Sequence, residues 1–147
     1  MIYLASDHRG MELKARMKEW LHDWGLPYED CGPMHVDPLD DYPDFIKVAA
    51  EKVAAAPLEH RAIVLGATGQ GEAMVCNRYK GVRATVYYGG NRDILTMSRE
   101  HNDANVLSLG AAFMEPDEVK IAIHHFLNTP FSGEERHLRR IKKIDRD

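Results

Sequence analysis

Cysteine is scarce in this chain, and long apolar runs are missing. Only two cysteines, Cys31 and Cys76, occur among the 147 residues, and they form no C-x-x-C unit, so a disulfide-stapled secreted scaffold is not indicated. No stretch approaches the roughly 18 apolar residues of a membrane span. The apolar run 2–5 reaches Asp7 at once, unlike a signal peptide. We therefore expect a cytoplasmic protein that does not bind membranes.

A strong charge of either sign is also missing. Lys plus Arg total 19 against 23 Asp plus Glu, a net charge of -4, which argues against generic nucleic-acid binding but leaves room for a local anion site. The eight histidines are scattered without H-E-x-x-H spacing, so no metal site is predicted. With 44% hydrophobic and 29% charged residues, we expect one ordinary globular domain over 1–147.

Short apolar runs alternate with segments of helical periodicity along the chain. The predicted strands are 2–5, 28–31, 62–65, 82–86 and 106–109, and the predicted helices are 11–24, 43–53, 72–78, 91–101 and 115–127, followed by a basic helix at about 134–144. This alternation predicts an α/β fold: a Rossmann-like three-layer α/β/α sandwich around a five-stranded parallel sheet, with an extra C-terminal helix.

The segment from Gly66 to Glu72 is the first candidate site, because ligands bind beyond the carboxyl ends of parallel strands. Its G-x-x-G-x-G pattern is neither the dinucleotide fingerprint nor the P-loop. Its glycines let a ligand approach backbone N–H groups, which favour an anion or a developing oxyanion. We expect the helix dipole to keep Glu72 in its charged form, as a general base. A tight strand–helix turn is the alternative.

Three further polar segments carry candidate chemistry, each with a structural alternative. Asp7-His8 follows the first strand and is either part of the site or a helix N-cap. The segment 98–105 precedes a strand, so it is either a polar loop or a contribution to a site across a dimer interface. Arg136 and Arg140 share one helix face, which suits phosphate binding or an ordinary solvated surface.

Together these segments resemble the ribose-5-phosphate isomerase type B family, which includes galactose-6-phosphate isomerase subunits. The resemblance runs from about residue 2 to 144, through Asp41-Tyr42-Pro43, the run N-R-Y-K-G-V-R-A at 77–84 and S-R-E-H-N-D-A-N-V-L at 98–107. It implies conversion of ribose 5-phosphate to ribulose 5-phosphate in the pentose phosphate pathway, through a cis-enediolate and without metal or organic cofactor. It further implies a homodimer, or a tetramer, that shares its active sites.

The resemblance also implies roles for individual residues. One branch of the family has a catalytic Cys at the position of Gly66, and this chain matches the other branch, with Glu72 as the base. The remaining implied roles are Thr68 with the backbone of Gly69 and Gly71 for the enediolate oxygen, His101 of the neighbouring subunit for ring opening, Asp7 for the sugar hydroxyls, Asn102 for holding the substrate, Tyr42 for the sugar end of the pocket, and His8 with the second subunit's Arg136 and Arg140 for the phosphate.

One position departs from the resemblance. Ala112 stands where many members carry a phosphate-contacting Arg, and losing such a contact costs about 1.5–3 kcal/mol. Arg9, beside His8, is the candidate replacement. The alternative substrates are a hexose 6-phosphate of the allose or galactose type, or an unphosphorylated sugar, and the alternative outside enzymes is a phosphosugar-binding module.

Overall fold

Five parallel strands form the centre of the computed structural model, which describes residues 1–145. Their order across the sheet is β2-β1-β3-β5-β4. Their bounds are β1 (Ile2–Ala5), β2 (Tyr28–Asp30), β3 (Arg61–Gly66), β4 (Ala84–Tyr87) and β5 (Val106–Gly110). The predicted five-stranded parallel sheet is confirmed.

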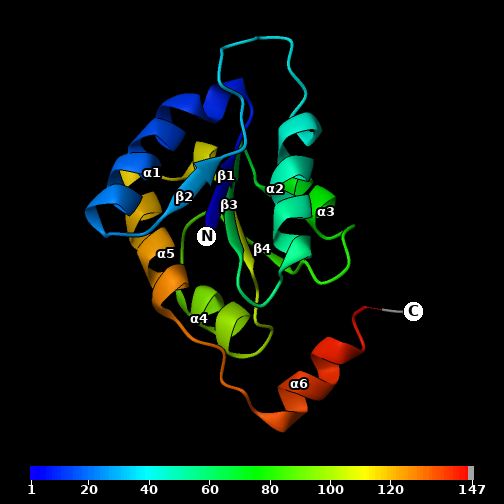
Figure 1. Cartoon of the computed structure of the whole chain (residues 1–147). Helices are drawn as coiled ribbons and strands as arrows, with labels where there is room; N and C mark the ends of the chain where they lie inside the picture. Colours follow the sequence, from blue (N-terminus) through cyan, green and yellow to red (C-terminus); the bar gives the residue numbers. More distant parts are fainter. Residues whose placement is uncertain (146–147) are drawn as a thin grey trace.

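Helices cover both faces of this sheet (Figure 1). Their bounds are α1 (Met11–Asp23), α2 (Pro43–Ala55), α3 (Gln70–Cys76), α4 (Asp93–Glu100), α5 (Pro116–Asn128) and α6 (Glu135–Lys142), with short 3₁₀ turns η1 (His8–Gly10) and η2 (Ala111–Phe113). Side chains of α1, α4 and α5 share one buried cluster with the sheet, and those of α2 and α3 share another. The predicted three layers are therefore present.

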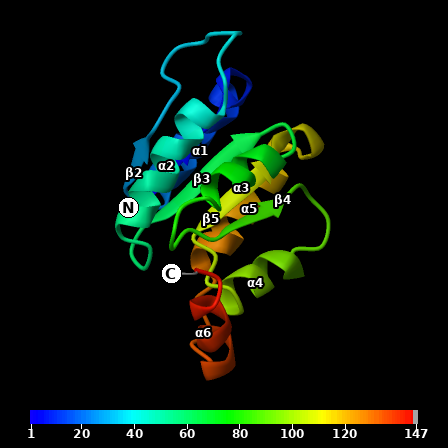
Figure 2. The ribbon, with the colours of Figure 1, turned by 90° about the vertical axis from the view of Figure 1, so that its right-hand side faces the viewer.

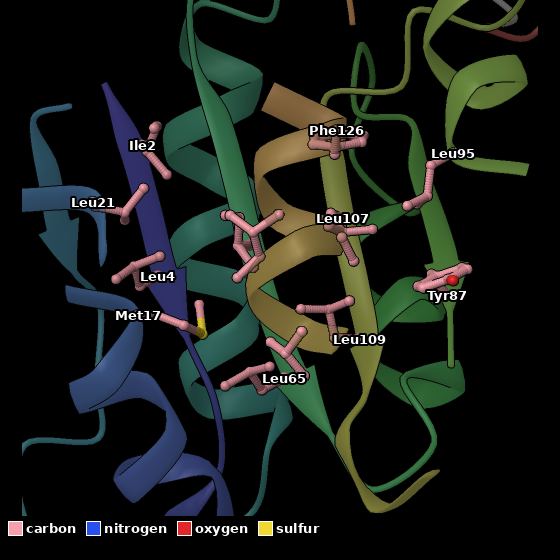
Figure 3. Close-up of a cluster of buried hydrophobic side chains, with 14 of the residues drawn as sticks. Ile2, Leu4, Met17, Leu21, Leu65, Tyr87, Leu95, Leu107, Leu109 and Phe126 are labelled. Atoms are coloured by element: carbon pink, nitrogen blue, oxygen red, sulfur yellow. The ribbon is translucent and has the colours of Figure 1, made fainter. Parts of the chain in front are cut away.

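Alternate residues of each strand enter the two buried clusters, as the pleat of a strand requires. On β1, Leu4 belongs to the cluster under α1 and α5, whereas Tyr3 and Ala5 belong to the cluster under α2 and α3. Figure 3 shows Leu65 of β3 and Leu107 of β5 pointing into the first cluster. Because both faces are covered, the central strands read as continuous apolar runs.

The starts of β4, α4 and α3 each differ by two residues from the predicted starts, and a local hydrogen bond accounts for the first two differences. β4 begins at residue 84 rather than 82, since the Val82 N–H donates to the Tyr79 carbonyl oxygen in a turn (3.1 Å). α4 begins at residue 93 rather than 91, because the Asn91 side chain accepts from the Asp93 N–H (2.9 Å). α3 begins at residue 70, two residues earlier than predicted.

The chain leaves β1 and β3, which are neighbours, toward opposite faces of the sheet. β1 leads to α1 and β3 leads to α3, so the loops after these strands diverge and open a crevice between them, where α/β proteins bind ligands. α6 lies apart from this crevice, at the end of the molecule opposite the 32–42 loop (Figures 1 and 2). Within residues 1–145, no helix combines the length and apolarity that a membrane crossing requires.

Candidate active site

The glycine loop after β3 is held against the neighbouring strand β5. The Ser108 hydroxyl donates a 2.6 Å hydrogen bond to the Gly69 carbonyl oxygen. Gly69 has a φ of 75°, and a Cβ atom there would lie 3.0 Å from the Leu109 carbonyl carbon, so both conformation and space require glycine. The Thr68 hydroxyl accepts from the Gln70 N–H (3.2 Å), which leaves its own proton available to a ligand.

The Glu72 side chain occupies the space beside Gly66. Glu72 is only 6% exposed, and a Cβ atom added to Gly66 would collide with its carboxylate. A side chain at position 66 and a carboxylate from position 72 therefore compete for the same volume at the carboxyl end of β3. A thiol side chain at position 66 would therefore displace the Glu72 carboxylate from this place.

Burial raises the pKa of Glu72 above its ordinary value. A hydrogen bond from its own backbone N–H acts in the opposite direction, and the charge of Asp7 raises the pKa further. The helix dipole favours the charged form, whereas desolvation, the largest cause of this pKa shift, acts in the opposite direction. A carboxylate with a raised pKa is the stronger base, which proton abstraction from carbon requires.

Two more predicted residues lie around this acid. Asp7 accepts a hydrogen bond from the Gly10 N–H (3.1 Å), so it is an N-cap as well as a neighbour of Glu72. Tyr42, at the start of α2, places its phenol against Gly71, where an added Cβ atom would collide with the hydroxyl group. The structure thus gathers Asp7, Tyr42 and Glu72 around the glycine loop.

His8 pairs with a residue that the sequence patterns did not single out. Its Nδ1 lies 2.6 Å from Oδ1 of Asp40, which belongs to the 32–42 loop. The sequence showed this loop only as a polar connection containing two prolines. No spacing rule links residues that are 32 positions apart, so only the fold reveals this pair.

His101 and Asn102 lie at the amino-terminal ends of the parallel strands, whereas Glu72 lies at their carboxyl-terminal ends. They precede β5, whereas the glycine loop follows β3, and the two strands pair in parallel register along their length. The paired part of β3 spans four residue steps of about 3.3 Å, so the two ends of the strands lie about 13 Å apart. One copy of the chain therefore does not bring His101 or Asn102 to Glu72.

A buried ionic cluster fixes the turn that carries His101 and Asn102. Asp103 has a φ of 44°, and its carboxylate lies 2.8 Å from Arg99, 3.4 Å from Arg83 and 4.0 Å from Arg61. Arg99, whose side chain is 6% exposed, also donates to the Ala104 carbonyl oxygen (2.6 Å). Asp tolerates the left-handed conformation better than most residues, so the tight turn and the ion pairs support each other.

α6 contacts this turn through a pair of stacked imidazole rings. The rings of His137 and His101 lie 4.4 Å apart at an interplanar angle of 15°. Arg136 pairs with Glu134 at 3.0 Å, with both side chains more than half exposed, and Arg140 is exposed on the same helix. The structure thus groups His101 with the two arginines, away from the glycine loop of the same chain.

A cavity of about 460 Å³ adjoins the glycine loop. Asp7, Gly66 and Ala112 line it, together with Arg9 and Arg16. Neither arginine has an ion pair within residues 1–145. Ala112 and Arg9 therefore line the same cavity. This is what we expect if the Arg9 guanidinium replaces the arginine that is missing at position 112.

Neither a group of metal ligands nor a P-loop lysine occurs where the structure describes the chain. Within residues 1–145, no three His, Cys, Asp or Glu side chains are grouped to hold a metal ion. The glycine loop lacks the lysine that a P-loop uses on phosphates. Both thiols are poor nucleophiles: burial raises the pKa of Cys31 to about 11 and that of Cys76 to about 12.

The fold and the site together define a class of protein. A parallel α/β sheet presents a backbone-lined glycine loop and one buried acid of raised pKa at its switch point. This arrangement is typical of enzymes that move a proton on a small substrate bound beyond the strand ends.

Comparison with known proteins identifies the family within that class. The model of the Ribose/Galactose Isomerase family matches residues 2–144, and the chain belongs to this family. The probable ribose-5-phosphate isomerase B of Mycoplasma pneumoniae is 39% identical over 143 residues, covering 97% of this chain and 91% of the relative. The ribose-5-phosphate isomerase B of Mycobacterium tuberculosis is 36% identical over 140 residues, covering 95% and 85%.

Solved structures agree with this assignment. The crystal structure of ribose-5-phosphate isomerase B from Mycoplasma genitalium with bound ribulose-5-phosphate is similar with a TM-score of 0.92 and 37% identity, covering 97% of this chain and 92% of that one. The predicted family, fold class and enzyme class, an aldose–ketose isomerase, are confirmed. The alternative of a non-catalytic binding module is thereby set aside.

Proposed function

We propose that the chain interconverts ribose 5-phosphate and ribulose 5-phosphate, with Glu72 as the base that moves a proton between C2 and C1. The observation that carries this proposal is the buried Glu72 carboxylate in the space beside Gly66. The similarity to ribose-5-phosphate isomerases B supports the choice of sugar. Residues 1–147 would act as one domain in the cytoplasm, within the pentose phosphate pathway.

The chemistry divides between the acid and the loop. On the open-chain aldose, Glu72 removes the proton from C2, a double bond forms between C1 and C2, and the carbonyl electron pair moves to O1. The Thr68 hydroxyl and the backbone N–H groups of residues 69–71 stabilise the resulting enediolate oxygen. Asp7 then takes the proton of the C2 hydroxyl group and passes it to O1. As the carbonyl forms at C2, the protonated Glu72 delivers its proton to C1.

A second copy of the chain would complete each site. Ring opening by His101, substrate contact by Asn102 and phosphate binding by Arg136 and Arg140 require these groups near His8 and Glu72, and one chain leaves them about 13 Å away or farther. Exposed apolar side chains are available for such an interface: Met74, Tyr88, Ile94, Met97, Phe113 and Leu138 are each at least 41% exposed. We propose a homodimer, alone or within a tetramer.

A subunit-mixing experiment tests the shared site. Glu72→Gln and His101→Asn each disable the site, but random mixing of the two variants creates heterodimers with one intact site and should restore about a quarter of wild-type activity. Glu72→Gln mixed with Asp7→Asn is the matched control, because both changes fall on the same half-site and no intact site forms. Equal results from the two mixtures contradict the sharing.

A hexose 6-phosphate is the second candidate substrate, because Ala112 stands where the resemblance implies a phosphate-contacting Arg. The experiment is a panel of ribose 5-phosphate, allose 6-phosphate, galactose 6-phosphate and the free sugars, followed by coupled assay and by proton exchange with deuterated water. We expect the highest kcat/KM with ribose 5-phosphate. A preference for a hexose phosphate or for a free sugar would instead make that sugar the substrate.

A further inference from the structure

The contact between His8 and the 32–42 loop has a consequence for phosphate binding. We infer that Asp40 is a positioning residue that holds the His8 imidazole with its outer nitrogen toward the phosphate. The inference rests on the proposed function, in which His8 binds the phosphate of the sugar. It adds a residue to which neither the motifs nor the family resemblance assigned a role.

The geometry of the pair is that of an oriented histidine. Asp40 Oδ1 lies 2.6 Å from His8 Nδ1, and the side chains are only 5% and 20% exposed. A carboxylate oxygen is an acceptor, so this contact places a proton on Nδ1. The other ring nitrogen, Nε2, has no protein partner and is not buried within residues 1–145. When the ring is protonated, Nε2 can donate to a phosphate oxygen while Nδ1 stays bound to Asp40.

The surroundings of Asp40 show that this contact is its main one. Its second oxygen, Oδ2, is buried without a hydrogen-bond partner, and no Lys or Arg within residues 1–145 pairs with it. A buried carboxylate with so few partners is costly, and a stretch of loop that only connected β2 to α2 would not need it. Asp37 offers the contrast: its carboxylate is exposed and caps the Leu39 N–H of the same loop.

His8 and Asp40 are each close in sequence to a residue of the proposed site. His8 directly follows Asp7 at the carboxyl end of β1, and Asp40 lies two residues before Tyr42, whose phenol contacts Gly71. The 32–42 loop therefore spans from the sugar end of the proposed pocket to its phosphate end. Through Asp40 it would set the direction of His8, and through Tyr42 the wall beside Glu72.

The test measures phosphate binding separately from turnover. In Asp40→Asn, which keeps the size of the side chain, we expect the inhibition constant of inorganic phosphate and the KM for ribose 5-phosphate to rise about tenfold, with kcat within about threefold of wild type. The ¹⁵N shifts of the His8 ring should show loss of the fixed Nδ1–H form. Asp37→Asn, in the same loop, is the matched control and should leave all three values unchanged.

A double variant distinguishes positioning from a structural role. If Asp40 acts through His8, the variant His8→Ala/Asp40→Asn binds phosphate no more weakly than His8→Ala alone. Additive losses, or a lower melting temperature of Asp40→Asn with unchanged phosphate binding and ring shifts, overturn the inference. If His8→Ala itself leaves phosphate binding unchanged, the assignment of His8 in the proposed function fails, and the inference with it. A wild type that binds phosphate without isomerising ribose 5-phosphate overturns the proposed function alone.

Discussion

The glycine loop (66–72) and the turn that carries His101 and Asn102 (the 99–105 turn) both adjoin the central strands, but different interactions fix their shapes. The loop is shaped by backbone and by absent side chains, and its one acid, Glu72, is buried without an ion pair in residues 1–145. The turn is shaped by charged side chains, with three arginines around Asp103. The first arrangement leaves an acid and N–H groups open to chemistry, whereas the second uses its charges to hold a rigid shape.

The largest expected effect is on the acid of the loop. Glu72→Gln removes the proposed base, so kcat should fall by about 10²–10⁴-fold, as measured by the coupled assay. Wild-type turnover in this variant would reject Glu72 as the base.

The same variant should be more stable than wild type near neutral pH. Because the pKa of Glu72 is raised in the folded protein, its contribution to stability is complete below the pKa of the unfolded chain and is lost as the pH rises through the folded pKa. Glu72→Gln escapes this loss, so its melting temperature should exceed that of wild type at about pH 8 but not at about pH 4. A variant that is less stable at both pH values would contradict the cause assigned to the pKa shift.

The turn should respond in the reverse way, by losing stability. Asp103→Asn keeps a residue that tolerates a positive φ but leaves buried guanidinium groups without their carboxylate, which should cost about 3 kcal/mol in urea unfolding. Glu134→Gln, which breaks an exposed ion pair with Arg136, is the control and should change stability by less than about 0.5 kcal/mol. Similar small losses in both variants would mean that backbone bonds alone hold the turn.

A smaller effect tests the competition for space beside Gly66. Gly66→Ala should displace the Glu72 carboxylate and cost about 1–3 kcal/mol of stability. In a Glu72→Gly background the added methyl group fits, so most of that cost should vanish. Equal costs in the two backgrounds, measured by urea unfolding, would show that the strain lies in the backbone instead.

The smallest expected effect is the pH response of α6. Burial, and then the neighbouring His101, lower the pKa of His137 below its ordinary value of 6.5. The stability that this ring contributes is therefore present above the pKa of the unfolded chain and is lost as the pH falls through the folded pKa. The protection factors of the α6 amides against hydrogen exchange should fall at acid pH in wild type and less so in His137→Phe, which keeps the ring stack without the titration. Identical pH dependence in both proteins would contradict this source.

The strands and helices were predictable because burial on both faces leaves apolar runs and because helical spacing is local. Their ends were less so: Asn91 and Val82 form local turns that a periodicity does not distinguish from the first residues of an element. The glycine loop and Glu72 could be recognised from their spacing. The partnership of Asp40 with His8 and the stack of His137 on His101 could not, because each joins residues more than 30 positions apart.

The amino-acid sequence by itself determined the order of strands and helices, the glycines that allow a ligand near the backbone, and the presence of one acid at position 72. The tertiary structure alone decided the direction of the Glu72 pKa shift, since desolvation depends on what is packed over the carboxylate rather than on its place in a helix. It also decided that His101 and Glu72 lie at opposite ends of the parallel strands. Parallel pairing sets that separation, because it aligns the ends of β3 and β5 and leaves the loops at either end a strand length apart.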